Sequence, residues 1–562
     1  MLWLKKPVLW HSSRVPSGYD YAKMTPGERL LIRERFHDWY SADWDYALTT
    51  VYLFCAVIGL VALVRWASIF RPRKTNAPAG IVDKLVAVGG FLVTKQFRLA
   101  AFNYDSPPLA AMGAVVGLFV FTMALMLAVK PYYWPNHEMG HSPPIATRSG
   151  WISIAIMPFM IAFATKINFI GLLARTSHER LQVFHRWSAT IMYITSLVHT
   201  FPFIINNIDM GMMRAEWKTS SYYWTGVVAL IPQTYLVACS WGYFRNGYYE
   251  TFKKLHFVAA GLFMAALFVH CCFRLTSWDY FWATLALYGT AWITRLVRGL
   301  VTPGTATLEG LPDRTLLARV STSRRFTWAP GQHVFVRFML GPVHFATTHP
   351  FTVSNCHSAG GSLELIMRVR DGITQELYRR AAAGGAVRVF VDGPYGHATL
   401  ARDLRAYDRV LFLAGGSGAT FTLPLLVDLV TNGRAEATIE FVVAVRESGS
   451  LEWIDRQLRD LKGAEPPRVA ITTYITRGTS VSEKDGDAPD VASRHEDEGR
   501  PDLAALIRNA CSGAAARVAI IACGPDEFAY DVRRAVAAEQ LRVACGEASA
   551  VEVYLHAENY SW

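Results

Sequence analysis

The hydrophobic pattern divides the chain into two halves. Residues 1 to about 300 carry long apolar runs, whereas the remainder alternates short β-rich runs and helical stretches with Gly/Pro turns. Seven runs are long enough to cross the ~30 Å hydrocarbon core of a bilayer as helices. They lie at about 47–70, 109–129, 151–171, 181–205, 222–243, 253–273 and 278–296. The pattern predicts a multi-domain membrane protein, in which a seven-helix transmembrane domain precedes a soluble half.

Basic residues predict how these spans are oriented. Arginines and lysines cluster after the first, third, fifth and seventh spans, at 65–74, 175–180, 245–254 and 295–298. Because short cytosolic loops are enriched in Lys and Arg, we expect residues 1–46 outside and the carboxyl-terminal half in the cytosol. The first seven residues have no apolar core adequate for a cleavable signal, so the first span is expected to direct membrane insertion.

The segment 75–107, between the first two spans, reads neither as a membrane span nor as an ordinary polar loop. Ile81–Val93 is apolar but contains Asp83, Lys84 and a pair of glycines. We interpret this segment as an interfacial connection on the cytosolic side.

Two spans contain histidines at the same spacing. His185 and His199 lie in one span, His256 and His270 in another, and each pair is fourteen residues apart. Fourteen steps of an α-helix return a side chain to within about 40° of the same face and move it ~21 Å along the axis. A lone histidine on an apolar helix is more often a hydrogen-bonded core residue. Ionisable groups in a bilayer need partners, however, and the repeated spacing predicts two stacked haems, each held by one histidine from either helix.

Composition narrows the possible partners. The chain is 52% hydrophobic and has a net charge of +11. The basic residues cluster at helix ends and scatter through the soluble half, which favours anionic lipid and anionic cofactors over nucleic acid. The eight cysteines lie mostly in spans or in the cytosolic half, so we expect no disulfide framework.

The first part of the soluble half has the pattern of a small β-barrel, with strands expected at 314–320, 333–340 and 363–369. One run offers a ring for stacking, hydroxyls and backbone donors, and so suits an isoalloxazine ring; it contains His349, Pro350, Phe351, Thr352 and Ser354. Arg368 and Thr374 flank an Asp-Gly turn at a helix start, a combination that suits a pyrophosphate. A Gly-Pro-Tyr-Gly turn at 393–396 is expected to close the barrel. Each motif alone is also typical of an ordinary strand start or turn.

From about residue 405, strands and helices alternate. A buried strand at 410–414 precedes a glycine-rich turn and a helix, and the turn contains Gly415, Gly416, Gly418 and Thr420. Such a turn lets the backbone approach a phosphate and aims the helix dipole at it, although it is also typical of a tight connection. Arg446, after the next strand, suits a 2′-phosphate and favours NADPH, or is simply solvated. The strand 518–522 brings Cys523 and Gly524 to the carboxyl edge of the sheet, where ligands bind.

Two segments of the soluble half are less informative. The Ser/Gly/Asp/Glu-rich stretch 478–500 is expected to be a disordered insert. Trp562 ends the chain after a strand, and it would either cover the flavin ring or fray.

The outer surface contains candidate contacts for an electron acceptor. His137, Glu138 and His141, in the loop after the second span, suit a transient Fe(III) or Cu(II) site, although the same pattern fits an ordinary polar loop. Arg148 and Arg274 lie near the outer face, where they would neutralise haem propionates or attract anionic iron chelates.

In the order of these parts the chain resembles the ferric reductase family of fungal plasma membranes (ferric/cupric-chelate reductases), which is related to the NADPH oxidases. The resemblance extends from about residue 47 onward and depends on the histidine spacing, the 349–355 run and the turns at 393–396, 415–420 and 523–525. It implies an extra helix at 47–70 and a six-helix haem domain at 109–300. A ferredoxin-reductase-like module then follows, made of an FAD-binding β-barrel at 301–402 and an NADPH-binding α/β domain at 403–562.

The resemblance also implies residue roles. His185 with His256 would ligate an inner b-type haem, and His199 with His270 an outer one. FAD would contact His349, Pro350, Phe351, Thr352 and Ser354. NADPH would contact Gly415, Gly416, Gly418, Thr420, Arg446, Cys523 and Gly524, with Cys523 near the nicotinamide ring.

The implied activity is ferric or cupric chelate reduction, with electrons passing from cytosolic NADPH through FAD and two haems to the metal outside. One alternative is an NADPH oxidase that makes superoxide. Another is a haem protein with a cytosolic binding module, which the flavin and nucleotide motifs disfavour. The sequence shows no calcium-binding loop and no long cysteine-bearing outer loop, and this favours the metalloreductase.

The expected partners are membrane lipid, extracellular chelates and, functionally, an iron-uptake oxidase/permease. The expected location is the plasma membrane, with the vacuolar membrane as the alternative.

Overall fold

A computed structural model of the chain describes residues 20–32, 41–69, 80–99, 104–134, 142–341, 347–358, 361–396, 399–433, 437–458, 469–477, 492–512 and 516–559. The chain separates into two compact units. The first comprises residues up to 71 together with 111–293, and the second comprises 72–110 and 294–562. This division follows composition, because the first unit holds most of the long apolar helices and the second holds both six-stranded sheets.

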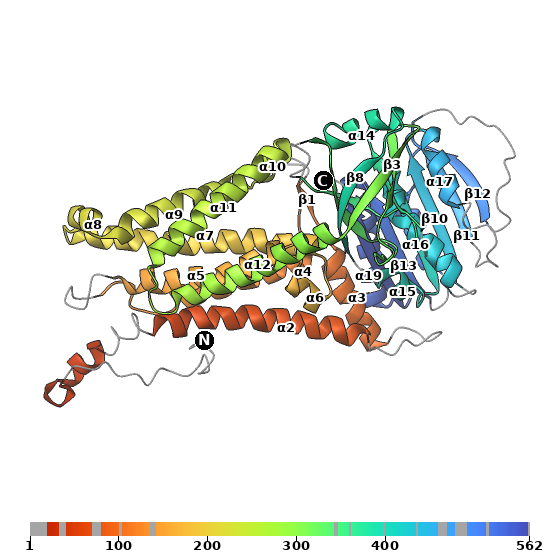
Figure 1. Cartoon of the computed structure of the whole chain (residues 1–562). Helices are drawn as coiled ribbons and strands as arrows, with labels where there is room; N and C mark the ends of the chain where they lie inside the picture. The colour runs from red at the N-terminus through yellow and green to blue at the C-terminus, as the bar shows by residue number, and fades with distance from the viewer. Residues whose placement is uncertain are drawn as a thin grey trace. The chain divides into compact units, whose positions relative to one another are not determined.

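Long helices form in the first unit because its apolar runs have few polar interruptions. They run side by side (Figure 1) and are α2 (Thr49–Ile69), α4 (Leu109–Leu127), α5 (Pro144–Ala164), α7 (His178–Asp209), α9 (Ser221–Ala238), α11 (Tyr249–Cys271) and α12 (Ser277–Val301). A π-helical turn at Asp43–Leu48 leads into α2, and short helices join the others: α6 (Phe169–Ala174), α8 (Met213–Thr219) and α10 (Gly242–Gly247). Each long helix occupies one of the seven positions that the hydrophobic pattern predicts.

Five of the described helices are long and apolar enough to cross a membrane. They span Asp43–Ala67, Leu109–Leu127, Pro144–Ala164, His178–Asp209 and Thr251–Cys271. α9 and α12 lie at predicted positions without meeting that criterion. The transmembrane character is therefore confirmed, whereas the count of seven spans stays a prediction.

Helix α5 is the centre of the helical unit. It packs along α7 and also contacts α2. Ile152, Ile156 and Met157 of α5 are buried in one cluster with Ile191 and Met192 of α7. By contrast, α4 and α11 expose many large apolar side chains, as expected for helices surrounded by lipid rather than water.

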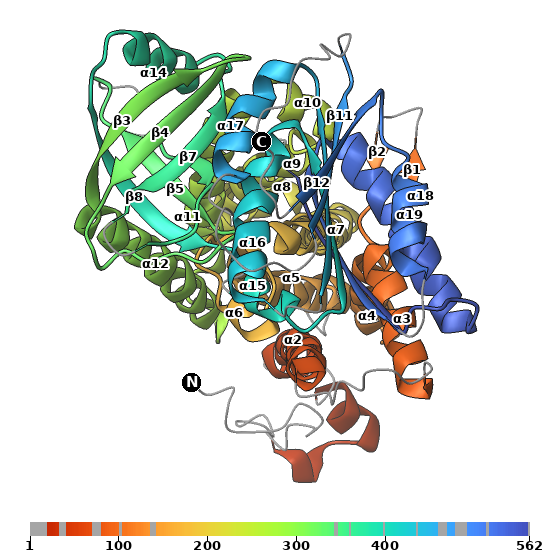
Figure 2. The same cartoon turned by 90° about the vertical axis from the view of Figure 1, so that its right-hand side faces the viewer.

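The first sheet of the second unit is antiparallel, with the strand order β6-β5-β8-β3-β4-β7 (Figure 2). Its strands are β3 (Pro303–Leu311), β4 (Thr315–Ser321), β5 (His333–Phe338), β6 (His349–Thr352), β7 (Leu363–Arg368) and β8 (Val387–Tyr395), and α14 (Ile373–Ala382) follows β7. The backbone N–H of Ser354, just after β6, donates to Glu364 of β7 over 2.9 Å. This bond joins the two end strands, so the sheet closes into the expected barrel.

The second sheet is entirely parallel, in the order β12-β11-β10-β9-β13-β14. Its strands are β9 (Arg409–Gly415), β10 (Thr438–Val445), β11 (Val469–Ile475), β12 (Ala492–Glu498), β13 (Arg517–Gly524) and β14 (Glu552–Asn559). The strand order reverses between β9 and β13. In open α/β sheets ligands bind at such a reversal, outside the carboxyl ends of the strands.

Helices cover both faces of this parallel sheet, because its strands are apolar on both sides. Val410 and Phe412 of β9 face one core, and Leu411 and Leu413 face the other. α15 (Leu400–Leu404), α16 (Ala419–Asn432) and α17 (Leu451–Leu458) cover the first face, and α18 (Leu503–Cys511) and α19 (Asp526–Cys545) cover the second.

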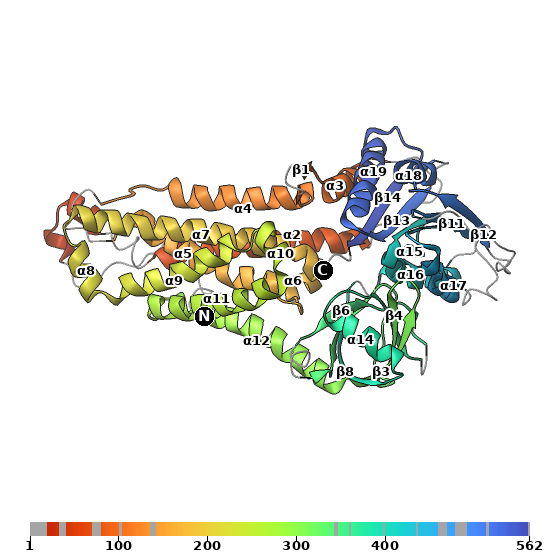
Figure 3. The ribbon, with the colours of Figure 1, turned by 90° about the horizontal axis from the view of Figure 1, so that it is seen from above.

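Two segments differ from the expectations. Residues 492–498 form the edge strand β12, paired in parallel with β11, whereas we expected a disordered insert through 478–500; residues 478–491 lie outside the described part. The polar sequence of β12 suits an edge strand, which needs backbone pairing but no apolar pattern. The connection at 75–107 contains a regular helix, α3 (Ile81–Thr94), which packs along α19 (Figure 3).

Candidate functional site

Two histidine pairs face each other in the helical unit. His185 on α7 lies opposite His256 on α11, with ring centroids 6.4 Å apart. His199 lies opposite His270, with ring centroids 6.0 Å apart. This is the pairing that the fourteen-residue spacing predicts. Whether the pairs bind a metal stays a prediction.

The spacing of the rings suits one metal ion between the members of each pair. Two metal–nitrogen bonds of ~2 Å, plus about 1 Å from each nitrogen to its ring centre, give roughly 6 Å. Among the described residues no cluster of three or more His, Cys, Asp or Glu is placed to hold a metal ion. A haem needs only two protein ligands, because its macrocycle supplies the other four. The donor set therefore fits a haem better than an ion caged by side chains.

Backbone carbonyls orient three of the four imidazole rings. The Nδ1 distances are 2.9 Å from His185 to Met160 O, 2.7 Å from His199 to Ala146 O, and 3.0 Å from His270 to Tyr222 O. An Nδ1–H that donates to a carbonyl leaves Nε2 unprotonated and available to a metal. His256 differs, since its Nδ1 is buried without a hydrogen-bond partner in the described part of the chain.

Two glycines allow neighbouring helices to approach these rings. A Cβ added to Gly150 of α5 would lie 2.6 Å from His199 Nδ1, and one added to Gly226 of α9 would lie 3.1 Å from His270 Cε1. Sequence reasoning missed both glycines, because nothing in the hydrophobic pattern marks a contact between helices.

Two arginines lie near the second histidine pair. Arg148 is fully buried on α5, and its Nη2 donates to Pro131 O over 2.8 Å. Its Nε and Nη1 have no hydrogen-bond partner among the described residues. Arg274 stacks over the Tyr222 ring at 4.7 Å. The role of both arginines as counter-charges stays a prediction, and His137 and His141 lie outside the described residues.

The strand expected to hold a flavin ring is β6. It pairs with β5 at one end of the strand order, and all four of its residues, His349, Pro350, Phe351 and Thr352, are partly exposed. The strand therefore presents an accessible surface with aromatic rings and one hydroxyl. Ser354 differs, because it is buried and its hydroxyl donates to Glu364 O over 3.0 Å.

The expected pyrophosphate turn lies between β7 and α14. Gly372 has a φ of 82°, which favours glycine, and α14 begins at the next residue. The Thr374 hydroxyl donates to Arg370 O and accepts from Arg370 N, both over 2.8 Å. The hydroxyl thus closes the turn, and Arg368 lies exposed at the end of β7, just before the turn.

The two nucleotide motifs lie against each other at the reversal of the parallel sheet. The glycine-rich turn starts at Gly415, the last residue of β9, and contains Gly416, Gly418 and Thr420. Cys523 and Gly524 are the last two residues of the neighbouring strand β13. A Cβ on Gly418 would overlap Cys523 O, and one on Gly415 would lie 3.4 Å from Gly524 Cα. Only glycine permits this approach, so the two turns form one surface at the carboxyl edge.

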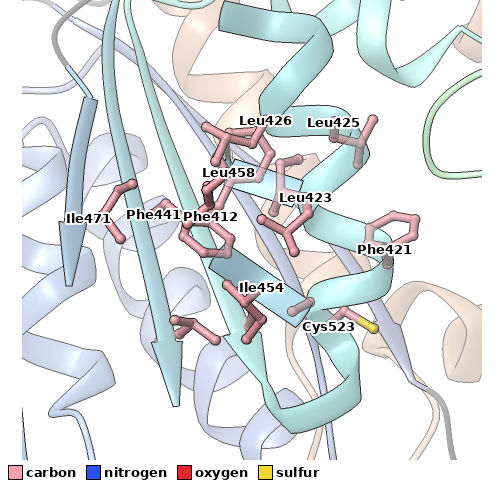
Figure 4. Close-up of a cluster of buried hydrophobic side chains, with 14 of the residues drawn as sticks. Phe412, Phe421, Leu423, Leu425, Leu426, Phe441, Ile454, Leu458, Ile471 and Cys523 are labelled. Carbon is pink, nitrogen blue, oxygen red and sulfur yellow. The ribbon is translucent and has the colours of Figure 1, made fainter. Parts of the chain in front are cut away.

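The Cys523 side chain lies in the core that α16 and α17 form with the sheet (Figure 4). Only 5% of the residue is exposed. Burial raises the pKa of its thiol, and Glu558 raises it further. The thiol is therefore protonated at neutral pH, which suits a residue that shapes a pocket rather than a nucleophile.

Helix α16 joins the nucleotide turn to the barrel. Phe421 of α16 stacks on His556 of β14, with ring centroids 5.7 Å apart. On the barrel side, a Cβ added to Gly331 would lie only 3.2 Å from the Phe421 ring. Cys356, after β6, contacts Pro424 O of α16 at 3.2 Å. These contacts bring the two cofactor surfaces close together within the second unit. Arg446 directly follows β10, as expected, and Trp562 lies outside the described residues.

The turn at 393–396 does more than close the barrel. Tyr395 donates to Asp392 Oδ1 over 2.6 Å, and Arg295 at the end of α12 donates to Asp392 Oδ2 over 3.1 Å. Arg298 stacks over the Tyr395 ring at 5.6 Å. In the sequence, Arg295 and Arg298 served only to predict the orientation of the spans. In the structure, their contacts with Asp392 and Tyr395 attach the end of α12 to the barrel.

Three family models match successive parts of the chain. Residues 149–267 match the ferric reductase like transmembrane component, residues 303–399 an FAD-binding domain, and residues 407–537 the ferric reductase NAD binding domain. In these three successive regions the chain matches the ferric reductase family. The antiparallel sheet lies in the region that matches the FAD-binding domain, and the parallel sheet lies largely in the region that matches the NAD binding domain.

Curated relatives carry the same description. The chain is 29% identical to the probable cell surface ferric reductase kap2 of Aspergillus oryzae over 68% of its own length and 54% of that protein. It is 26% identical to the ferric/cupric reductase transmembrane component 7 of Saccharomyces cerevisiae, over 77% of its length and 72% of that protein. The match thus spans about half of the first relative and nearly three quarters of the second.

Among solved structures, the chain is 15% identical to a ferredoxin NADP+ reductase from Neisseria gonorrhoeae with bound FAD and NADP. The likeness covers 46% of this chain and 98% of that one, with a TM-score of 0.33.

Proposed function

We propose that this ferric reductase takes electrons from NADPH on the cytosolic side of a membrane and delivers them to ferric or cupric chelates on the other side. Its relatives are described as ferric reductases or ferric/cupric reductases. Seven spans, with residues 1–46 outside and the two sheets in the cytosol, are the topology that the basic loops favour. The plasma membrane is the proposed location.

The two histidine pairs are the observation that supports electron transfer across the membrane. We assign His185 and His256 to an inner haem, and His199 and His270 to an outer one. When bound, flavin and haem convert the two-electron chemistry of a hydride into single-electron steps, which a metal ion requires. The four imidazoles would hold the haem irons, and hydrogen bonds to three backbone carbonyls would favour the tautomer whose Nε2 is free for ligation.

The surface at the carboxyl edge of the parallel sheet is assigned to the nicotinamide nucleotide. The glycine turn allows close approach of phosphates, and α16 begins directly after it, so its amino-terminal N–H groups point at them. Arg446 is assigned to a 2′-phosphate, which favours NADPH. Cys523 shapes the nicotinamide pocket, and β6 presents the face on which the flavin stacks.

Two arginines supply positive charge for the proposed acceptor side of the second histidine pair. The Nε and Nη1 atoms of Arg148 have no hydrogen-bond partner in the described part of the chain. Arg274 stacks over Tyr222, whose carbonyl lies 3.0 Å from Nδ1 of His270. We assign this pair of cations to the propionates of the outer haem or to an anionic chelate. A ferrous or cuprous product suits a functional partner of the uptake oxidase/permease class.

A comparison of products tests this function against superoxide production. Purified protein in sealed vesicles is supplied with NADPH, and ferrous ion, cuprous ion and superoxide are measured in parallel. We expect metal reduction that superoxide dismutase does not suppress. Superoxide in excess of metal reduction, together with iron reduction abolished by the dismutase, would establish an NADPH oxidase instead.

A further inference from the structure

Helix α3 turns its polar residues toward the protein and its apolar residues outward. On the inner face, Ala87 and Thr94 are buried against the nucleotide-binding domain. A Cβ on Gly90 would lie 2.9 Å from Gln540 Nε2 of α19, and Lys84 Nζ lies 3.0 Å from a Cβ placed on Gly546. α3 is thus an integral part of the nucleotide-binding domain, although the chain places it far from that domain in sequence.

The outer face of α3 contains no charged or polar side chain. Its large apolar residues have exposed fractions from 40% to 80%, and they are Ile81, Val82, Leu85, Val86, Val88, Leu92 and Val93. From residue 302 onward, the described chain exposes only one large apolar residue to a comparable extent, Leu541. A contiguous apolar surface of this kind marks an interaction site rather than a face that water covers.

Chain connectivity places α3 at the end of a membrane-spanning helix. The amide N of Leu109, the first residue of α4, donates to Lys95 O, directly after α3, over 3.0 Å. Between these two helices, β1 (Arg98–Leu99) pairs in antiparallel fashion with β2 (Tyr104–Asp105). Arg98 forms an ion pair with Asp105 and stacks on Tyr530 of α19 at 4.3 Å. Since α4 is long and apolar enough to span a bilayer, the end of α3 lies at the membrane boundary.

We propose that the outer face of α3 inserts into the cytosolic leaflet and holds the nucleotide-binding domain at the membrane surface. An amphipathic helix that lies in the interface buries its apolar face at the boundary of headgroups and acyl chains. Here the other face carries a protein domain instead of facing water. The inference requires that α4 spans the membrane, but it does not depend on the acceptor or on the haems.

Photo-crosslinking in the full-length protein tests this proposal. In the test variant, a photoreactive leucine analogue replaces Leu85, and the protein is placed in nanodiscs of phosphatidylcholine and phosphatidylserine. In the control variant, the same analogue replaces Arg508 of α18, whose side chain is 68% exposed. The analogue is close to leucine in size, so folding at position 85 is preserved, and bound FAD confirms this. We expect lipid adducts at position 85 at least tenfold above those at position 508.

Two outcomes would overturn the proposal. Equal lipid labelling at both positions would mean that water covers α3. Adducts at position 85 to a second copy of the chain, in place of lipid, would identify the outer face as a dimer contact. Neither outcome affects NADPH-dependent metal reduction, so failure of this proposal is distinguishable from failure of the proposed function.

Discussion

At the scale of single residues, the histidines depend on neighbours that carry no chemistry of their own. His199 is oriented by the Ala146 carbonyl and lies against Gly150, both on α5. The histidines themselves are predictable from sequence, because a repeated spacing on two helices is a strong signal. Gly150 is not, since its importance comes from a contact between helices that the sequence does not encode locally.

Gly150→Ala tests this dependence. The added Cβ would lie 2.6 Å from His199 Nδ1, so the ring must move and lose its hydrogen bond to Ala146. We expect about half of the haem to be lost, with the remaining haem held by His185 and His256. Gly117→Ala in α4 is the control, because nothing lies within 4 Å of its added Cβ. The pyridine haemochrome assay measures the haem content, and equal haem in both variants would contradict the assignment.

Cys523 gives a prediction about pH. Burial raises the pKa of this thiol above its ordinary value, so the reactive thiolate forms only at a pH above the ordinary range near 8.5. At pH 8 we expect N-ethylmaleimide to label the exposed Cys545 and leave Cys523 largely unmodified, as read by peptide mass spectrometry. Cys523 labelled as fast as Cys545 would show that the thiol is accessible and ionised.

At the scale of elements, the parallel sheet was predictable because its strands are continuous apolar runs that alternate with helices. The edge strand β12 was not predictable, because residues Ala492–Glu498 have no apolar pattern. This strand forms only through its backbone pairing with β11. Likewise, the sequence identified the two nucleotide turns separately, but only the strand order β9-β13 brings them together.

Gly418→Ala tests whether the two turns form one binding surface. The new Cβ would overlap the backbone carbonyl of Cys523, so the turns must separate. We expect the KM for NADPH to rise about tenfold or more, equivalent to ~1.4 kcal/mol of binding energy, with FAD content unchanged. Gly385→Ala, where nothing lies within 4 Å of the added Cβ, should leave the KM unchanged. An unaltered KM in Gly418→Ala would remove this turn from the nucleotide site.

At the scale of the whole molecule, the separation into a helical unit and a unit with two sheets follows from composition. The apolar unit provides paired imidazoles within long helices, and the mixed unit provides two sheets joined by α16. The sequence predicts this division well, because hydrophobic runs and alternating strands are long-range signals. It does not predict that α3 belongs to the nucleotide-binding domain, because α3 contacts residues more than 400 positions later in the chain, such as Gln540 and Gly546.

The most direct test of the central claim follows electrons through the intact protein. Sealed vesicles containing the wild-type protein, or the His199→Ala variant, receive NADPH on the cytosolic face without oxygen, and a ferric chelate is present only on the opposite face. Stopped-flow absorbance records haem reduction and the ferrous product together. We predict that wild-type haem is reduced before ferrous ion appears, and that His199→Ala retains reduction of one haem while ferrous production falls at least a hundredfold. Ferrous production at the wild-type rate in His199→Ala would contradict the account.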